Sequence, residues 1–537
     1  MNLSRRRALG MIAAVPPSLI CGRIHAASMQ ARQDWYQADL VHLIPSANHE
    51  QILIKASFRD SRRIAPRLRV GDVAIDGTMT DTAGRFWQFR AKGLQPATEY
   101  ELRLEQEDNG KRTDSWRLRT FPAPGADVEQ LRILTYTCAG GNERLKMANG
   151  ETFFLSMDER RRLLQRGLDF NPDVVVANGD HIYWDQRTTR NKPEWFRAPW
   201  LELFEEYGAM DRGKPVLGTS NEPVLKRIVD DQIALLYGVM LRSVPSFFLS
   251  DDHDMFENDE AHEDFFTLPP DRHMLNAARA TQRLYYPEFL PDQTRDNWLP
   301  GALTCRADDL SESFGTLRYG KLFEALLYDT KRYVSLQGPV ATMVPPEVEA
   351  WLARRTTATD TAHLAHIPST PLGWSAGKWG EWYPDVLQSN GSLGTTTPKP
   401  YWPGGWWHQH QRIVEMLAKQ HSRPALIMSG DIHALACGQI TASGELKFSE
   451  NPVHALCVGP IGATGPGFPS RFRGTGATVP GALRVEELLA PLEKNGFSII
   501  DVTRRSMKVR FFGWLREESV ARIQTMQPLF EHEIALS

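Results

Sequence analysis

The chain has 537 residues, which is too long for a single ordinary core, so two or more domains are expected. A hydrophobic fraction of 42% and a charged fraction of 24% are typical of soluble globular proteins. The formal net charge of −3 excludes a broad basic surface, so we expect no stable nucleic acid partner.

The first residues are typical of an export signal. Arg5 and Arg6 precede an apolar run that extends to Cys21, which is the order of regions in a signal peptide. The paired arginines predict a twin-arginine-type signal peptide over 1–29, the twin-arginine translocation machinery as a partner, and a periplasmic or secreted protein, which cell fractionation would test. Lipid attachment at Cys21 is the alternative, although a bulky Ile20 precedes it. No segment is long and apolar enough for us to expect a transmembrane segment.

Residues 30–124 are predicted to form an N-terminal β-sandwich domain. Short alternating segments separated by turn residues are typical of an all-β fold. The segments are 52–58, 68–70, 86–89, 100–104 and 116–120. Residues 93–100 resemble the tyrosine-corner turn of fibronectin/Ig-like sandwiches, and residues 121–125 are typical of a linker.

Residues 130–537 show the pattern of a layered α/β domain, with sheets flanked by helices. Apolar runs that predict buried strands lie at 131–136, 174–177, 246–249, 323–328 and 425–428. Amphipathic patterns predict helices at 160–168 and 407–421. Near the end, 497–502 and 507–512 predict a hairpin that closes a sheet.

Side chains that can bind metals directly follow four of these strands. These side chains are Cys138, Asp180, Tyr183, Asp252, Asp431 and His433. In open α/β sheets, ligands bind beyond the carboxyl ends of the strands, so we expect these side chains to meet in one crevice.

These residue types suit hydrolysis of a phosphate ester. Two cations can neutralise phosphoryl oxygens and lower the pKa of a bound water that attacks the phosphorus. A carboxylate such as Asp180 can bridge both ions. A thiolate and a phenolate suit a trivalent or softer ion, whereas Asp252 and Asp431 offer the hard oxygens that calcium, manganese or magnesium prefer.

The motifs that carry these residues resemble those of the PhoD-like branch of the calcineurin-like metallophosphoesterases, known as alkaline phosphatase D. They are Gly-Asp-x-Ile-Tyr at 179–183, Asp-Asp-His-Asp at 251–254 and Ser-Gly-Asp-x-His at 429–433, with a further segment at 327–333. The resemblance covers nearly everything after the leader. In the wider superfamily the first motif is typically Asp-x-His and the last is Gly-His-x-His. This sequence departs from the first motif at Cys138 and from the last at Asp431, and both departures fit the PhoD-like branch.

The resemblance implies a metallophosphoesterase catalytic domain over 130–537 that acts as a phosphomonoesterase, a phosphodiesterase or both. It implies iron, as Fe³⁺, near Cys138, Asp180, Tyr183 and His433. It implies calcium near Asp180, Asp252 and Asp431, with manganese or zinc as alternatives.

Several neighbouring residues have predicted roles. The resemblance implies that His253 is a catalytic residue that assists the leaving group. His181 and Arg332 are candidate substrate-binding residues. Asp251 is expected to support the ligands or cap a helix, and Asp254 to orient His253 or cap a helix.

Two rival functions are open on the sequence. Gly-x-Ser-x-Gly at 373–377 fits the nucleophile elbow of a serine hydrolase, but its flanks predict a loop rather than a strand and a helix. The other rival is a non-catalytic binding module, in which the sandwich binds and the second domain is a scaffold. Metal removal separates the phosphoesterase from the serine enzyme, and any turnover excludes the binding module.

Overall fold

The computed structural model describes residues 35–536 apart from 108–109, 147–149, 263–264, 297–298, 302–308 and 464–469. The predicted signal peptide over 1–29 therefore lies outside the described residues. From Gln37 onward the chain packs as one compact unit. Among the described residues, no helix combines the length and the apolar character that crossing a membrane requires.

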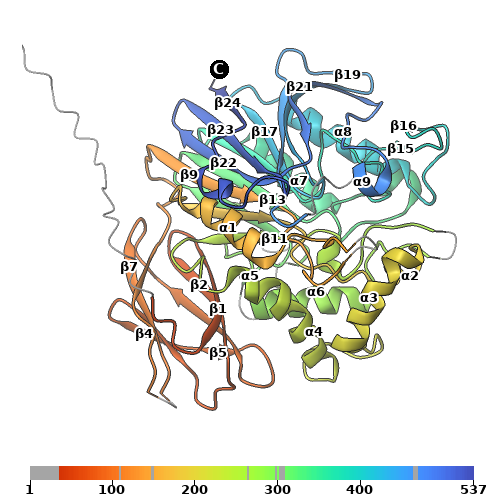
Figure 1. Cartoon of the computed structure of the whole chain (residues 1–537). Helices are drawn as coiled ribbons and strands as arrows, with labels where there is room; N and C mark the ends of the chain where they lie inside the picture. The colour runs from red at the N-terminus through yellow and green to blue at the C-terminus, as the bar shows by residue number, and fades with distance from the viewer. Residues whose placement is uncertain are drawn as a thin grey trace, which may run out of the picture. The chain divides into compact units, whose positions relative to one another are not determined.

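Two four-stranded antiparallel sheets form from the region predicted to be all-β, coloured red to orange in Figure 1. One contains β1 (Leu40–Ala47), β2 (Gln51–Phe58), β6 (Phe86–Lys92) and β5 (Thr78–Met79), in that order. The other contains β4 (Val73–Asp76), β3 (Arg67–Val70), β7 (Glu99–Glu105) and β8 (Trp116–Arg119). At the predicted tyrosine corner, the Gln95 N–H donates a hydrogen bond of 2.8 Å to the Tyr100 hydroxyl.

Two larger sheets form the rest of the unit. The first has the order β11 (Ser246–Leu249), β10 (Val174–Asn178), β9 (Gln130–Tyr136), β22 (Asn495–Thr503), β23 (Ser506–Trp514) and β24 (Phe530–Ala535). The second has the order β12 (Phe314–Tyr319), β13 (Phe323–Tyr328), β14 (His363–Pro368), β17 (Ala425–Ser429), β20 (Val453–Val458), β18 (Leu435–Ser443) and β19 (Leu446–Lys447), and β21 (Leu483–Leu492) pairs with β18. All the predicted strands and the closing hairpin are present.

The two larger sheets pack face to face over one apolar layer. Ile133 and Val176 from the first sheet share a buried cluster with Leu327 and Met428 from the second. The first sheet contains three parallel neighbours, β9, β10 and β11, and the second contains four, β13, β14, β17 and β20. The carboxyl ends of these strands therefore lie at one edge of each sheet. The structure is therefore a mixed α/β fold of several sheets with helices outside the pair.

Helices cover the outer faces of this pair (Figure 1). The longer ones are α1 (Met157–Leu168), α3 (Glu194–Tyr207), α4 (Asn221–Val229), α6 (Arg272–Tyr285), α7 (Pro346–Thr357) and α8 (Gly404–Ala418). The shorter elements are α2 (Gln186–Arg190), α5 (Leu235–Tyr237), α9 (Ser470–Arg473), α10 (Arg522–Thr525), a π-helical turn Asp230–Ala234, 3-10 turns His253–Met255 and Gly338–Val340, and the strand pair Val386–Leu387 and Leu393–Gly394.

Both predicted helices are present as α1 and α8. The first begins three residues before its predicted start because Ser156 and Glu159 form a capping box at its N-terminus. On α8, Ile413 and Leu417 pack in one cluster with Ile427 of β17. The apolar face of α8 therefore buries the strand that leads into the candidate site.

Candidate active site

Four carboxyl ends from the two packed sheets deliver the predicted metal ligands. Cys138 follows β9, Asp180 follows β10, Asp252 follows β11 and Asp431 follows β17. Three of these residues have positive φ angles, namely 47° at Cys138, 61° at Asp180 and 62° at Asp431. A left-handed residue costs about 1–2 kcal/mol unless it is Gly, Asn or Asp, so the strain is greatest at Cys138.

Two glycines let these strand ends approach one another. A Cβ atom at Gly179 would lie 2.6 Å from the Cβ atom of Asp251, and one at Gly430 would lie 2.2 Å from the Asn178 carbonyl oxygen. Both distances are too short for any side chain, so the Gly-Asp pairs of the motifs are required by close packing as well as by chemistry.

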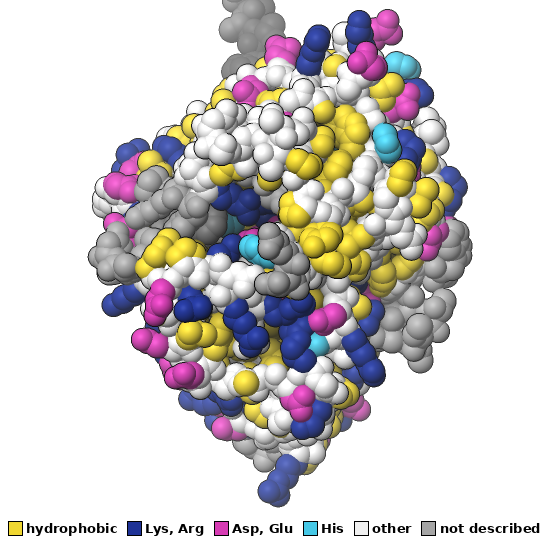
Figure 2. All heavy atoms as spheres, turned by 90° about the vertical axis from the view of Figure 1, so that its right-hand side faces the viewer, with side chains coloured by type: hydrophobic (Ala, Val, Ile, Leu, Met, Phe, Trp, Pro, Cys, Tyr) yellow, Lys and Arg dark blue, Asp and Glu magenta, His cyan; other side chains and the backbone are white. Residues whose placement is uncertain are grey.

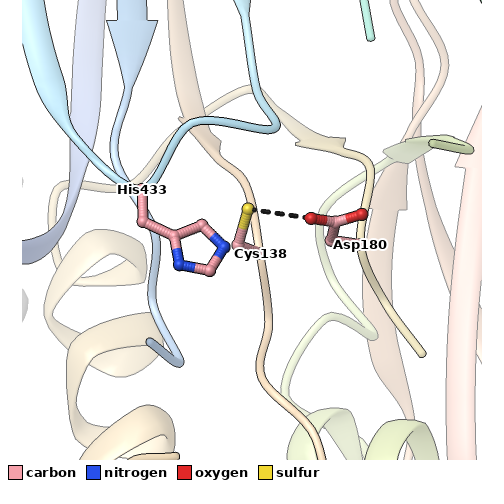
Figure 3. Close-up of side chains that lie close together, drawn as sticks. All are labelled: Cys138, Asp180 and His433. Atoms are coloured by element: carbon pink, nitrogen blue, oxygen red, sulfur yellow. Dashed lines mark hydrogen bonds between the residues drawn. The ribbon is translucent and has the colours of Figure 1, made fainter. Parts of the chain in front are cut away.

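The first cluster of donors contains Cys138, Asp180 and His433, which Figure 3 shows side by side, and Tyr183 joins it through its hydroxyl. The Cys138 Sγ atom lies 3.2 Å from Asp180 Oδ2, and the Tyr183 hydroxyl lies 3.0 Å from the same oxygen. The Tyr183 hydroxyl also lies 3.2 Å from His433 Nε2. A thiol, a carboxylate, a phenol and an imidazole therefore surround one point, which is a donor set for a transition metal.

The second cluster is acidic and shares Asp180 with the first. It contains Asp180, Asp251, Asp252 and Asp431, all of them buried. Asp180 Oδ1, Asp252 Oδ1, Asp431 Oδ2 and both carboxylate oxygens of Asp251 are buried and accept no hydrogen bond from any described residue. Buried carboxylate oxygens are costly without a partner, so this group of atoms marks where a cation would bind.

Ionisation at these two clusters is unfavourable without a cation. Burial, and then the charge of Asp180, raise the pKa of the Cys138 thiol well above its ordinary value. Burial also raises the pKa of Tyr183, with Asp180 again the next cause. The pKa of Asp180 itself is raised by burial and by Asp252 and Asp431. A bound metal ion reverses this balance, because it favours the deprotonated forms that serve as ligands.

His253 lies beside the first cluster, with its ring centroid 4.1 Å from that of Tyr183. Its Nδ1 atom is 2.8 Å from Asp185 Oδ1. Burial opposes a charge on His253, but Asp185, Asp252 and Asp180 outweigh it and raise its pKa well above the ordinary value. These carboxylates therefore favour the protonated form of His253.

The residue that orients His253 is Asp185, so the prediction that Asp254 has this role is wrong. Asp254 instead accepts hydrogen bonds of 2.8–2.9 Å from the backbone N–H groups of Asp180, His181 and Asp251. It fixes the loops that carry the ligands.

Lys378, which the sequence did not single out, lies inside the acidic cluster. Its Nζ atom is 2.6 Å from Asp431 Oδ1, 3.0 Å from Asp252 Oδ2 and 3.2 Å from Asp259 Oδ1. It follows the Gly-x-Ser-x-Gly segment by one residue, and that segment is a loop, as its flanks predicted.

The serine in that segment has no catalytic neighbours. The Ser375 hydroxyl donates to Glu381 Oε2 at 2.5 Å, and no histidine of the described residues is hydrogen-bonded to it. The loop therefore positions Lys378, and it lacks the base that a serine nucleophile needs.

The structure does not bring His181 and Arg332 to the site. The His181 ring is buried, and its Nε2 atom lies 3.1 Å from the Leu249 carbonyl oxygen. The Arg332 guanidinium is buried too, with Nε 3.2 Å from Asp329 Oδ2 and Nη1 3.6 Å from Glu312 Oε2. Both side chains therefore bond to neighbouring chain segments, and neither lines the two cavities described next.

Two cavities adjoin the clusters. A small one of about 40 Å³ is bordered by Lys378, Asp431 and His433, and a larger one of about 200 Å³ lies beside it. His253, Asn258 and Arg473 line both. On the face shown in Figure 2, Lys, Arg and His side chains lie in a hollow that has hydrophobic side chains along one rim.

Two solved structures share this architecture over most of the chain. PhoD matches with 13% sequence identity and a TM-score of 0.59, over 89% of this chain and 87% of that one. A purple acid phosphatase from yellow lupin (Lupinus luteus) seeds matches with 13% identity and a TM-score of 0.52, over 93% of this chain and 74% of that one. A scan against family models and a search of curated proteins give no match. The chain therefore has the fold of PhoD and of a purple acid phosphatase, as the motifs had led us to expect.

Proposed function

We propose that this protein is a metal-dependent hydrolase of phosphate esters. The observation that carries the proposal is the convergence of Cys138, Asp180, Tyr183 and His433 beside an acidic cluster whose buried oxygens have no hydrogen-bond partner among the described residues. The fold that it shares with PhoD and a purple acid phosphatase supports the same reaction.

The residues present fit the metals that the resemblance implies. Cys138, Asp180, Tyr183 and His433 would hold an iron-type ion, because a thiolate and a phenolate suit Fe³⁺. Asp180, Asp252 and Asp431 would hold calcium or another hard ion, with Asp180 shared. Bound metals at such a site supply charge neutralisation for phosphoryl oxygens and lower the pKa of a coordinated water.

The side chains around the clusters have distinct tasks. Arg473 and Lys378 line the small cavity and present positive charge to an anionic phosphoryl group. His253, oriented by Asp185, lines the same cavity and can give a proton to the departing alkoxide. Asp254 holds the backbone of the ligand loops through its three hydrogen bonds.

Removal of metal is expected to abolish hydrolysis of phosphate esters, because the carboxylates alone would repel an anionic substrate. The test is elemental analysis of the native protein, followed by activity on matched mono- and diesters before and after chelation. A ferric ion bound by a phenolate absorbs visible light, so Tyr183→Phe should lose that absorption and retain the fold. Full activity in protein shown to be free of metal would overturn the proposal, and no turnover of any phosphate ester by metal-loaded protein would favour a binding module.

Lys378→Met is expected to tighten calcium binding at the acidic cluster. The Lys378 ammonium competes with calcium for the acidic cluster, since it lies within 2.6–3.0 Å of oxygens on Asp431 and Asp252. Removal of one positive charge at this range should lower the Kd for calcium by at least about tenfold. Calorimetric titration measures it, with the exposed Lys419→Met as control. Unchanged or weaker calcium binding would mean that Lys378 organises the cluster instead of competing for it.

A further inference from the structure

The larger of the two cavities has an aromatic lining. Its volume is about 200 Å³, and it opens between α2, α3 and the segment that carries His253. Six aromatic side chains contribute to its walls, namely Phe153, Phe154, Tyr183, Trp195, Phe196 and Trp200. A pocket of about 150 Å³ accommodates a benzene ring, so this cavity has room for one ring with its substituents.

The rings form a continuous path from the surface to the candidate metal centre. At the outer end, Trp195 is 49% exposed and lies 5.9 Å from Phe196, between ring centroids. Phe196 lies 5.2 Å from Phe153, and Phe153 lies 4.9 Å from Phe154. At the inner end, Phe154 lies 4.9 Å from Tyr183, whose hydroxyl belongs to the first cluster.

The charged side chains of this cavity are largely paired with one another. The Lys192 ammonium forms an ion pair with Glu260. The carboxylate of Asp185 is 2.8 Å from His253 Nδ1. Arg473 lies at the wall shared with the small cavity, where it would face the phosphoryl group. The rest of the larger cavity offers a ligand apolar ring faces, and an uncharged group suits it best.

The two cavities share one wall, which fixes how a substrate would lie. His253, Asn258 and Arg473 line both. A phosphoryl group in the small cavity would have its ester oxygen beside His253, and the organic group on that oxygen would extend into the aromatic cavity.

We propose that the aromatic cavity binds the alcohol part of the substrate, and that the protein selects phosphate esters of aromatic or bulky apolar alcohols over those of small alcohols. This proposal rests on the phosphoester hydrolysis proposed above. It names the leaving group, which neither the metal ligands nor the fold specifies.

The test compares 2-phenylethyl phosphate with ethyl phosphate, because both leaving groups are simple alkoxides and differ mainly in the ring. The intact enzyme is expected to show at least about tenfold higher kcat/KM for the phenylethyl ester. Phe196→Ala and Trp195→Ala should each lower kcat/KM for the phenylethyl ester much more than for ethyl phosphate, so that most of this preference is lost. Tyr401→Ala, an exposed aromatic side chain outside the cavity lining, is the control.

A second measurement does not depend on turnover. Binding of 2-phenylethanol, followed by calorimetry, should weaken in the Phe196→Ala and Trp195→Ala variants but not in Tyr401→Ala. Equal kcat/KM for the two esters in the intact enzyme, or phenylethanol binding that the cavity variants leave unchanged, would overturn the proposal. If neither these monoesters nor the matched diesters are hydrolysed but the alcohol binds as expected, the hydrolase proposal fails and the aromatic site stands.

Discussion

Asp180→Asn is expected to remove both the bound metal and the turnover of this protein. Asp180 belongs to both donor clusters, since Oδ2 faces Cys138 and Tyr183 while Oδ1 is buried without a hydrogen-bond partner among the described residues. An amide of the same shape has no negative charge and directs an NH₂ group at one of the ions. We expect metal content to fall at both positions, and kcat/KM to fall by at least about a thousandfold.

Elemental analysis of the purified variant measures the metal content, and the melting temperature of metal-free samples shows whether the fold is retained. Asp60→Asn, an exposed carboxylate far from the strand ends in sequence, is the matched control. Full metal occupancy in Asp180→Asn would contradict the assignment of Asp180 as the bridging ligand.

His253→Ala is expected to lower kcat by about a hundredfold to ten-thousandfold and to leave metal content nearly intact. The structure supports this because His253 lines both cavities and is held by Asp185. A cationic imidazole beside the ester oxygen stabilises the negative charge that develops as the alkoxide departs. The defect should shrink for nitrophenyl esters, whose leaving groups need little assistance.

Kinetics on a nitrophenyl ester and an alkyl ester, with metal analysis of the same samples, separate the possible roles of this histidine. Asp185→Asn should give a smaller defect with the same dependence on the leaving group, because it perturbs the orientation of the ring. His421→Ala, an exposed histidine beyond α8, is the control. An equal defect on both esters would show that His253 binds the ground-state phosphate or a metal instead.

The candidate metal ligands could be placed near one another from the sequence because each follows an apolar run. A buried strand has to end where the core ends, so Asp180 and Asp431 at such ends point to one edge of a sheet. Asp185, Lys378 and Arg473 carry no such signal. They lie on loops or in a four-residue helix, and only tertiary packing decides which loop reaches the crevice.

Some strands could likewise be predicted from the sequence pattern, and others could not. Strands with continuous apolar runs, such as β10, were predicted within one residue. β1 and β14 were missed because buried histidines interrupt their patterns. His42 is buried with Nδ1 2.6 Å from the Ser57 hydroxyl, and His366 with Nε2 2.9 Å from the Thr356 hydroxyl. A hydrogen bond that compensates a polar group in the core is invisible in a hydropathy pattern.

The origin of the ligands in two different sheets has a consequence for maturation. Cys138 and Asp431, whose Sγ and carbonyl oxygen atoms lie 3.5 Å apart, are 293 residues apart in the chain. No short fragment contains a complete donor set, and the donors meet only after both sheets have formed and packed. We therefore expect metal insertion to follow folding. The ions present in the compartment where folding finishes would then decide which metal the protein takes up.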